Sequence, residues 1–221
     1  NLYGNFRSGS PAYGSFLSTG NATLAFRGTS YLQTWPGNLA AGTDRFTYQH
    51  VIIDNAKVTA PQVSLGGQVA LSGTLTLSRG IVRTTAANLL LLPAGFAVNG
   101  ASNLSFVDGP VSKTGNTAFT YPVGNAGNYK PLSITAPVLP SDAFTVQYIA
   151  ANPHPVYNNL LREPSLDNIS ECEYWMMTRT AGTSGVQPTL TWDGQSCCMG
   201  NPSPVRVADW DGAQWTDKGN G

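Results

Sequence analysis

The sequence predicts an all-β fold, arranged as an irregular right-handed β-solenoid followed by an antiparallel β-sandwich. Helical periodicity is almost absent, whereas short segments of alternating apolar and small polar residues recur along the chain. The 24 glycines and 15 prolines are spread between these segments, as turn residues are between short strands. Aromatic residues make up 10% of the chain, which indicates a folded protein rather than a disordered one.

The solenoid is predicted for residues 1–124. Between residues 66 and 115, very short strands alternate with corners rich in glycine, asparagine and proline, and their inward residues are nearly all aliphatic or Phe. This texture is typical of a solenoid, because each rung buries its face only against its neighbours. No strict repeat is visible, so the solenoid is expected to be irregular. The strands are predicted at 22–26, 46–53, 69–77, 81–84, 88–92, 96–98 and 104–107.

The β-sandwich is predicted for residues 125–221, with a boundary near 124–127. Its strands are longer and more widely spaced, and this part holds four of the five tryptophans. A short stretch at 156–162 lies between prolines and permits a helical turn or two at most. The chain ends in what looks like half a turn and begins without a signal peptide, which suggests an incomplete sandwich in a piece of a larger protein. The strands are predicted at 132–135, 144–149, 173–178, 189–192 and 205–210.

The charge of the chain excludes several partners. Charged residues make up only 11% of it, and 12 basic residues balance 12 acidic ones. No basic stripe is present for nucleic acid and no polybasic run for an anionic membrane. No apolar stretch is long enough to insert into a membrane as a helix. A surface of neutral polar residues suits an extracellular or cell-surface protein.

The three cysteines, Cys172, Cys197 and Cys198, predict one disulfide in an oxidising compartment. Cys172 would pair with either Cys197 or Cys198, because two adjacent cysteines rarely bond each other without strain. One thiol would then be left over. No histidine lies nearby to complete a zinc site.

The residues needed for catalysis are dispersed. His50 and His154 are the only histidines; His50 is interpreted as a residue on the face of a strand, and His154 lies in a loop with no acid close in sequence. Glu171 and Glu173 would share one face of a strand, where a solvated strand edge is the simpler interpretation. A polysaccharide-cleaving solenoid needs paired carboxylates on adjacent rungs, and the solenoid part contains no glutamate. The sequence therefore predicts a protein that is not an enzyme.

One cluster of acidic residues is a candidate calcium site. Asp209, Asp211 and Asp217 offer oxygen ligands at a spacing that calcium can use. The alternative is an ordinary Asp-Gly hairpin turn between two strands. No other cofactor is expected.

Exposed tryptophans are candidates for stacking on a glycan, although in a β-sandwich most tryptophans belong to the core. Alternation alone does not identify the exposed ones. The candidates are Trp35, Trp192, Trp210 and Trp215, with Trp175 considered beside them.

Four segments carry a recognisable pattern: GTLTLSRGIV (73–82), NLLLL (88–92), SFVDGPV (105–111) and KTGNTAFTYPVG (113–124). They resemble a pattern of very large surface proteins of gliding, type IX-secreting bacteria, in which Phe is usual where this chain has Tyr121. Matches at 129–134, 173–175 and 210–215 extend the resemblance.

The resemblance implies a secreted or surface-attached role, adhesin-like or filament-forming, and offers no catalytic residues. The expected partners are other domains or copies of the same surface protein, and glycans. A carbohydrate-binding module and, less favoured, a β-helix polysaccharide-degrading enzyme are the alternatives.

Overall fold

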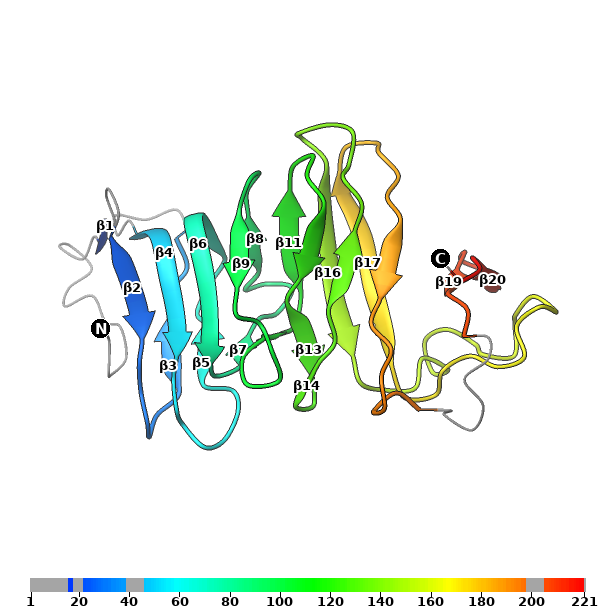
Figure 1. Cartoon of the computed structure of the whole chain (residues 1–221), viewed down its shortest axis with the longest axis horizontal. Helices are drawn as coiled ribbons and strands as arrows, with labels where there is room; N and C mark the ends of the chain where they lie inside the picture. Colours follow the sequence, from blue (N-terminus) through cyan, green and yellow to red (C-terminus); the bar gives the residue numbers. More distant parts are fainter. Residues whose placement is uncertain (1–15, 18–21, 39–45, 198–204, 221) are drawn as a thin grey trace.

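The chain forms an elongated stack of β-strands (Figure 1). The structure is a computed structural model, and it describes residues 16–17, 22–38, 46–197 and 205–220. Throughout these residues the fold is all-β and contains no helix; the stretch at 156–162 forms turns. The strands build a β-solenoid-like arrangement of about three turns. The all-β prediction and the solenoid-like part of the prediction are therefore confirmed.

The strands are short, as the dispersed glycines and prolines predict. Their bounds are β1 (Phe16–Leu17), β2 (Thr23–Phe26), β3 (Gln33–Trp35), β4 (Phe46–Asp54), β5 (Val63–Leu65), β6 (Val69–Arg79), β7 (Val82–Arg83), β8 (Leu90–Leu92), β9 (Ala97–Asn99), β10 (Val107–Asp108), β11 (Val111–Thr114), β12 (Phe119–Tyr121), β13 (Val123–Asn125), β14 (Asn128–Tyr129), β15 (Leu132–Ile134), β16 (Ala143–Ile149), β17 (Tyr174–Ala181), β18 (Pro188–Leu190), β19 (Ala208–Trp210) and β20 (Trp215–Asp217).

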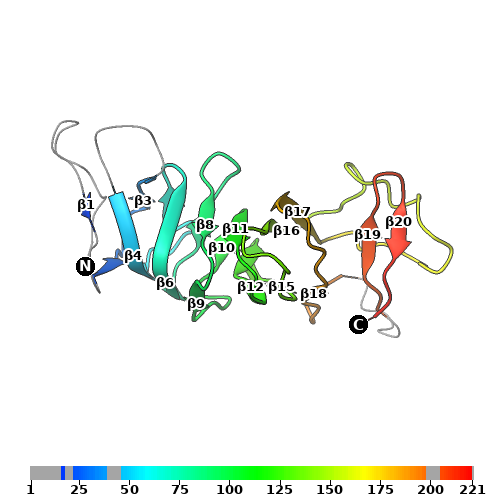
Figure 2. The same cartoon turned by 90° about the horizontal axis from the view of Figure 1, so that it is seen from above.

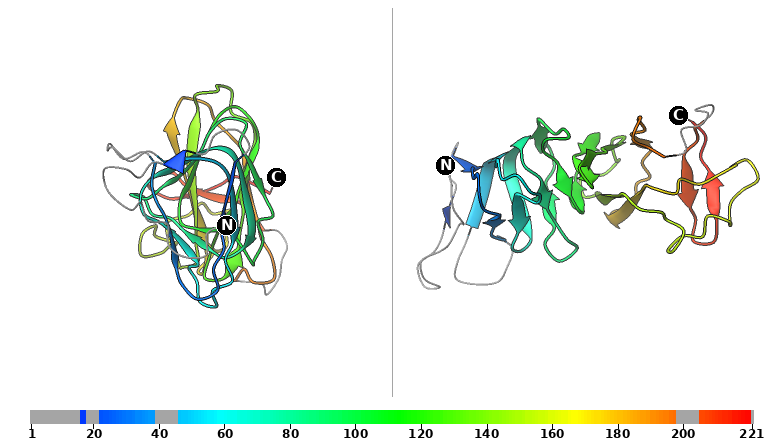
Figure 3. Two further views of the ribbon diagram at one scale, coloured as in Figure 1. Left: turned by 90° about the vertical axis from the view of Figure 1, so that its left-hand side faces the viewer. Right: turned by 90° about the horizontal axis from the view of Figure 1, so that it is seen from below.

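Two long sheets form the walls of the solenoid. The first has the order β1-β4-β6-β8-β11-β16-β17, with β2 on β4 and β9 on β6. The second has the order β14-β13-β10-β7-β5-β3. Rungs pair in parallel as far as β11 and β13, because the chain passes from one wall to the other and returns one rung further on. Viewed along the long axis, the successive turns lie over one another (Figure 3).

Ladders of buried aliphatic residues fill the space between the walls. On the second sheet, one inward valine from each of four successive strands occupies the same register position and is 0% exposed. These are Val63, Val82, Val107 and Val123. The first sheet has an equivalent ladder of Val69, Leu90, Val111 and Val146, also 0% exposed. Each member packs on the rung before and the rung after it, which makes the core continuous along the rod.

Buried amide side chains bind the backbone at one corner of the solenoid. Asn55 Oδ1 accepts a hydrogen bond from the Lys57 amide at 2.8 Å. Gln62 accepts a hydrogen bond from the Ile81 amide at 2.6 Å and donates to the Lys57 carbonyl at 2.9 Å. Backbone groups at a tight corner have no ladder partner, so these side chains supply the hydrogen bonds that burial demands.

The pairing changes from parallel to antiparallel after β11. Strands β16 and β17 extend the first sheet in antiparallel fashion, and β12, β15 and β18 form a small antiparallel sheet beside it. The change in strand length and spacing seen in the sequence beyond residue 124 therefore corresponds to this change from parallel to antiparallel pairing. The separate β-sandwich is not confirmed, because β16 and β17 continue a wall of the solenoid. The boundary at 124–127 stays a prediction.

A terminal hairpin, made of β19 and β20, lies beyond the end of the stacked strands (Figure 2). Trp215 anchors it against the segment that joins β16 to β17, where it packs with Leu166 and Ile169. The Trp215 amide donates to the Leu161 carbonyl at 2.8 Å, and its carbonyl accepts from the Glu163 amide at 3.0 Å. The hairpin is thus attached by a small core of its own.

Candidate functional site

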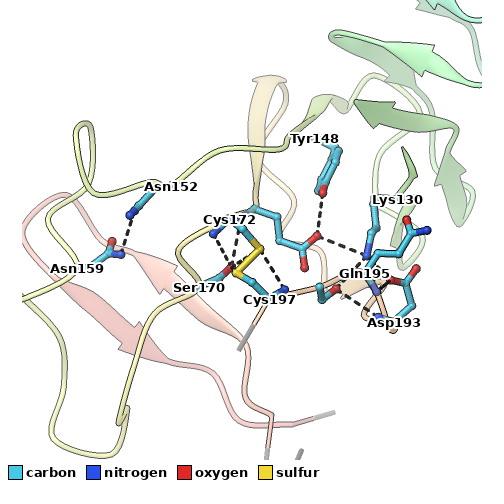
Figure 4. Close-up of a disulfide and its surroundings, with 11 residues drawn as sticks. Lys130, Tyr148, Asn152, Asn159, Ser170, Cys172, Asp193, Gln195 and Cys197 are labelled. Carbon is cyan, nitrogen blue, oxygen red and sulfur yellow. Dashed lines mark hydrogen bonds and ion pairs between the residues drawn. A yellow bond between two sulfur atoms is a disulfide. The ribbon is translucent and has the colours of Figure 1, made fainter. Parts of the chain in front are cut away.

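A buried lysine lies where the last strands of the solenoid meet the segment that leads to the terminal hairpin (Figure 4). Lys130 follows β14, and its side chain is 1% exposed. Its Nζ lies 2.6 Å from Asp193 Oδ1 and 3.5 Å from Glu173 Oε2. It also donates to Ser196 Oγ at 2.9 Å. We call Lys130, Tyr148, Glu173, Asp193 and Ser196 the lysine junction.

Glu173 is the buried carboxylate of the lysine junction, with a side chain 5% exposed. The Tyr148 hydroxyl donates to its Oε2 at 2.8 Å. Burial, followed by this contact with Glu173, raises the pKa of Tyr148, so the phenol stays protonated and remains a donor. The Trp175 ring lies tilted against the Tyr148 ring, with the centroids 5.1 Å apart, and its Nε1 donates to the Lys130 carbonyl at 3.0 Å.

Asp193 is the more accessible carboxylate, with a side chain 45% exposed. Its Oδ1 accepts from Lys130 and, at 2.9 Å, from the Gln195 amide. These hydrogen bonds, that from Lys130 first, hold the pKa of Asp193 below its usual value. The turn at 193–196 also donates from the Ser196 amide to the Asp193 carbonyl at 2.9 Å. The Asp193 carboxylate is therefore held in one orientation.

A disulfide lies directly beside the lysine junction and joins Cys172 to Cys197, with Cα atoms 5.9 Å apart. Of the two pairings left open by the sequence, the structure has this one. The Cys197 amide donates to Cys172 Sγ at 3.1 Å, and Ser170 Oγ lies 3.6 Å from Cys197 Sγ. Cys198 lies outside the described residues. The segment carrying Asp193 is thus covalently tied to the chain just before β17.

The structure corrects two of the four tryptophans predicted to stack on glycans. Trp35 is 0% exposed and packs between Phe26 and Tyr48, and Trp215 is 7% exposed in the core of the terminal hairpin. Neither ring can meet a sugar, because each fills a core that its strand alternation directs inward. Trp210 is half-buried.

Trp192 differs from the other tryptophans. It is 40% exposed and directly precedes Asp193. Trp175 is half-buried against the solenoid core. Trp192 is therefore the most accessible tryptophan ring of the described residues.

The three candidate calcium ligands do not converge. Asp211 Oδ1 accepts from the Ala213 and Gln214 amides at 2.8 Å each, which is the turn described by the alternative interpretation. Asp217 accepts from Arg206 at 2.6 Å, while Asp209 lies 3.9 Å from Lys218. The hydrogen bonds of the turn hold the pKa of Asp211 low. No group of three or more His, Cys, Asp or Glu side chains suited to a metal ion occurs within the described residues.

Neither histidine belongs to the lysine junction, and neither does Glu171. His50 on β4 shares a hydrogen bond with Thr74 at 2.9 Å, and His154 accepts from the Asn159 amide at 3.2 Å. Glu171 is exposed. The interpretation of Glu171 and Glu173 as a solvated strand edge is wrong for Glu173, since β17 begins only at Tyr174 and Glu173 is buried.

Sequence reasoning missed Lys130 altogether. The one available signal was a lysine followed by proline in a region almost free of charge. Its two carboxylate partners lie more than 40 residues further along the chain, and only the fold brings them to it. No helix within the described residues is long and apolar enough to cross a membrane.

Comparisons with protein-family models, with curated proteins and with solved structures give no match.

Proposed function

We propose that this chain is a structural or adhesive module of a secreted or cell-surface bacterial protein, and that it is not an enzyme. The observation that carries the proposal is the set of aliphatic ladders that run unbroken from rung to rung. A stack of this kind resists bending because each rung is packed on both neighbours. Such a rod separates or presents whatever is attached to its ends.

The extracellular part of the proposal is supported by the disulfide. Disulfides persist in oxidising compartments and are rare in the cytosol. The low charge content and the resemblance to type IX-secreted surface proteins agree with this location. We further propose the finer architecture, a right-handed solenoid whose antiparallel end belongs to a β-sandwich.

Self-association into a filament is the specific mechanism that we propose. Among the described residues, β17 pairs only with β16 and therefore ends the first sheet. An eight-residue edge strand can pair with a strand of another copy. Its Met176 side chain is 41% exposed, so it is available to such a contact.

Light scattering after size-exclusion chromatography over a wide range of protein concentrations tests this mechanism. We expect the average mass to rise with concentration, and Met176→Lys to reduce the rise because a charge at an edge disfavours pairing. Leu104→Lys is the matched control, since Leu104 is 70% exposed and lies in the loop between β9 and β10 rather than on the edge strand β17. A monomer at every concentration would rule out the filament.

Glycan binding is the second candidate function, and the exposure of Trp192 favours it. Affinity electrophoresis in gels that contain acidic or neutral polysaccharides measures it directly. Retardation that disappears in Trp192→Ala and persists in Leu104→Ala supports the candidate. Release of reducing sugar from the same polysaccharides would contradict the proposal that the chain is not an enzyme.

A further inference from the structure

We propose that Lys130 and Asp193 become joined by an intramolecular amide bond, an isopeptide cross-link, whose formation is assisted by Glu173. The chemical class of the site is a self-modifying one that needs no cofactor. The geometry of the lysine junction supports this bond independently of the proposed function.

The three reacting groups already lie in contact. Lys130 Nζ is 2.6 Å from Asp193 Oδ1, so the nitrogen lies next to the carboxyl group that it would attack. Glu173 Oε2 lies 3.5 Å from the same nitrogen, which places a proton acceptor on it. Holding reactants at such distances converts a bimolecular condensation into an intramolecular one, with a large gain in effective concentration.

The proton balance closes within the lysine junction. Transfer of one proton from the Lys130 ammonium to the Asp193 carboxylate gives a neutral amine and a neutral acid. The nitrogen lone pair then forms a bond to Cγ of Asp193, and Glu173 takes the second proton from nitrogen and passes it to the departing hydroxyl. The carbon–oxygen bond breaks and water leaves. An ammonium and a carboxylate thus become one amide and one water, with no change of oxidation state.

The surroundings favour each stage of this step. The Lys130 side chain is 1% exposed, so the attacking nitrogen is held away from bulk water and against its partners. The Gln195 amide donates to Asp193 Oδ1 at 2.9 Å and so fixes the carboxyl group beside the attacking nitrogen. Tyr148 holds Glu173 Oε2 at 2.8 Å and so fixes the proton acceptor. The 45% exposure of Asp193 gives the released water a way out.

A second buried lysine shows what is particular to Lys130. Lys113 is 3% exposed, but its Nζ donates to the Thr114 carbonyl and lies 5.4 Å from the centre of the Phe119 ring. No carboxylate of the described residues forms an ion pair with it. Lys113 is thus a matched lysine in the same protein that lacks both the target acid and the proton acceptor.

The cross-link would complete what the disulfide begins. The disulfide closes a loop between residues 172 and 197, and the amide would close a second between 130 and 193. Together they would bind β15 to β18 and the segment before the terminal hairpin into one covalent unit. Tension applied at either end of the rod would then bypass these strands.

Intact-mass spectrometry of the full chain tests the proposal. The chain is purified in its folded state and is then reduced and alkylated before the measurement. We expect a mass lower than that of the linear sequence by one water molecule. Tryptic digestion should yield a branched peptide that joins the segment of Lys130 to that of Asp193. Lys130→Met, Asp193→Ala and Glu173→Gln should each restore the full mass, while Lys113→Met should retain the deficit. Circular dichroism checks that the variants are folded.

Two outcomes overturn the proposal. If the wild-type chain has the full mass of the linear sequence and yields no branched peptide, the lysine junction is an ion pair only. Asp193 precedes Gly194, and an Asp-Gly sequence can lose water by itself as a cyclic imide. A deficit that persists in Lys130→Met and yields only linear peptides assigns the lost water to that imide. The wild-type measurement decides the question even where a variant fails to fold.

Discussion

Replacing Leu90 by alanine tests the aliphatic ladders directly. Leu90 on β8 is 0% exposed and lies in register between Val69 and Val111. The substitution removes three carbon atoms, which at about 0.8 kcal/mol for each buried methylene costs about 2.4 kcal/mol. The cavity left between two rungs adds to this, because the neighbouring strands are held in register and collapse only in part. We therefore expect the free energy of unfolding to fall by about 3 to 4 kcal/mol.

Urea denaturation followed by circular dichroism and by tryptophan fluorescence measures this loss. Leu104→Ala removes the same atoms from a side chain that is 70% exposed, and is expected to change stability by about 0.5 kcal/mol or less. The reasoning is refuted if the two variants unfold at the same urea concentration. A loss confined to one probe would indicate that the solenoid and the terminal hairpin unfold separately.

Three further predictions concern other parts of the fold. Gly109→Ala should destabilise more than Gly127→Ala in the same urea assay: both glycines have positive φ, but only at Gly109 would the new methyl press on the backbone, at the Thr84 carbonyl. Reducing the Cys172–Cys197 disulfide frees a loop of 25 residues and should lower stability by about 3 kcal/mol, measured with and without reductant. Acid should destabilise the fold, because hydrogen bonds to Asp142, that from the Ser184 hydroxyl first, lower the pKa of its carboxyl group. The stability that the Asp142 carboxylate contributes is complete above about pH 4 and is lost as the pH falls through the pKa of Asp142 in the folded state. Thermal melts across that pH range should show this loss.

Much of the solenoid could be predicted from the sequence, because its core depends on local alternation. The segment at 69–77 alternates apolar and small polar residues, and β6 buries Val69, Leu71, Leu75 and Leu77 as that pattern requires. The corners could also be predicted, because glycines mark them in the sequence. Gly80, Gly100 and Gly109 have positive φ, a backbone conformation that strains a residue with a side chain. Alternation with a period of two and the turn residues indicate which residues are buried and where strands end, whatever the order of the rungs.

The sandwich could not be distinguished from a continued wall for a related reason. Alternation shows which side of a strand is buried but not which strand lies beside it. Val146 and Phe144 on β16 alternate equally well in a separate domain or, as observed, against β11. The change from parallel to antiparallel pairing depends on the direction in which the chain runs after the loop before β16. The alternation of apolar and polar residues is the same for either direction.

The lysine junction was invisible because it depends on long-range placement. A buried ammonium is tolerated only beside groups that compensate its charge, so Lys130 by itself reads as a surface residue. Glu173 likewise reads as exposed until the disulfide at Cys172 and the start of β17 fix it against the solenoid. The disulfide and the ion pair of Lys130 belong to the same part of the structure. Only the disulfide could be predicted from residue type, because cysteines are rare and pair with each other.

The position of this junction in the rod has a mechanical meaning. A solenoid is quasi-one-dimensional, so its stability is a sum of neighbour contacts and its last rung has only one neighbour. At that end the half-buried Trp175 and Met177 cover the core from β17, the last strand of the first wall. Fraying there would open the stack rung by rung. Cys172 and Glu173 lie immediately before this strand, so the disulfide and the contact with Lys130 hold the rung whose loss would expose the next. The disulfide and the ion pair of Lys130 are thus found where the aliphatic ladders end.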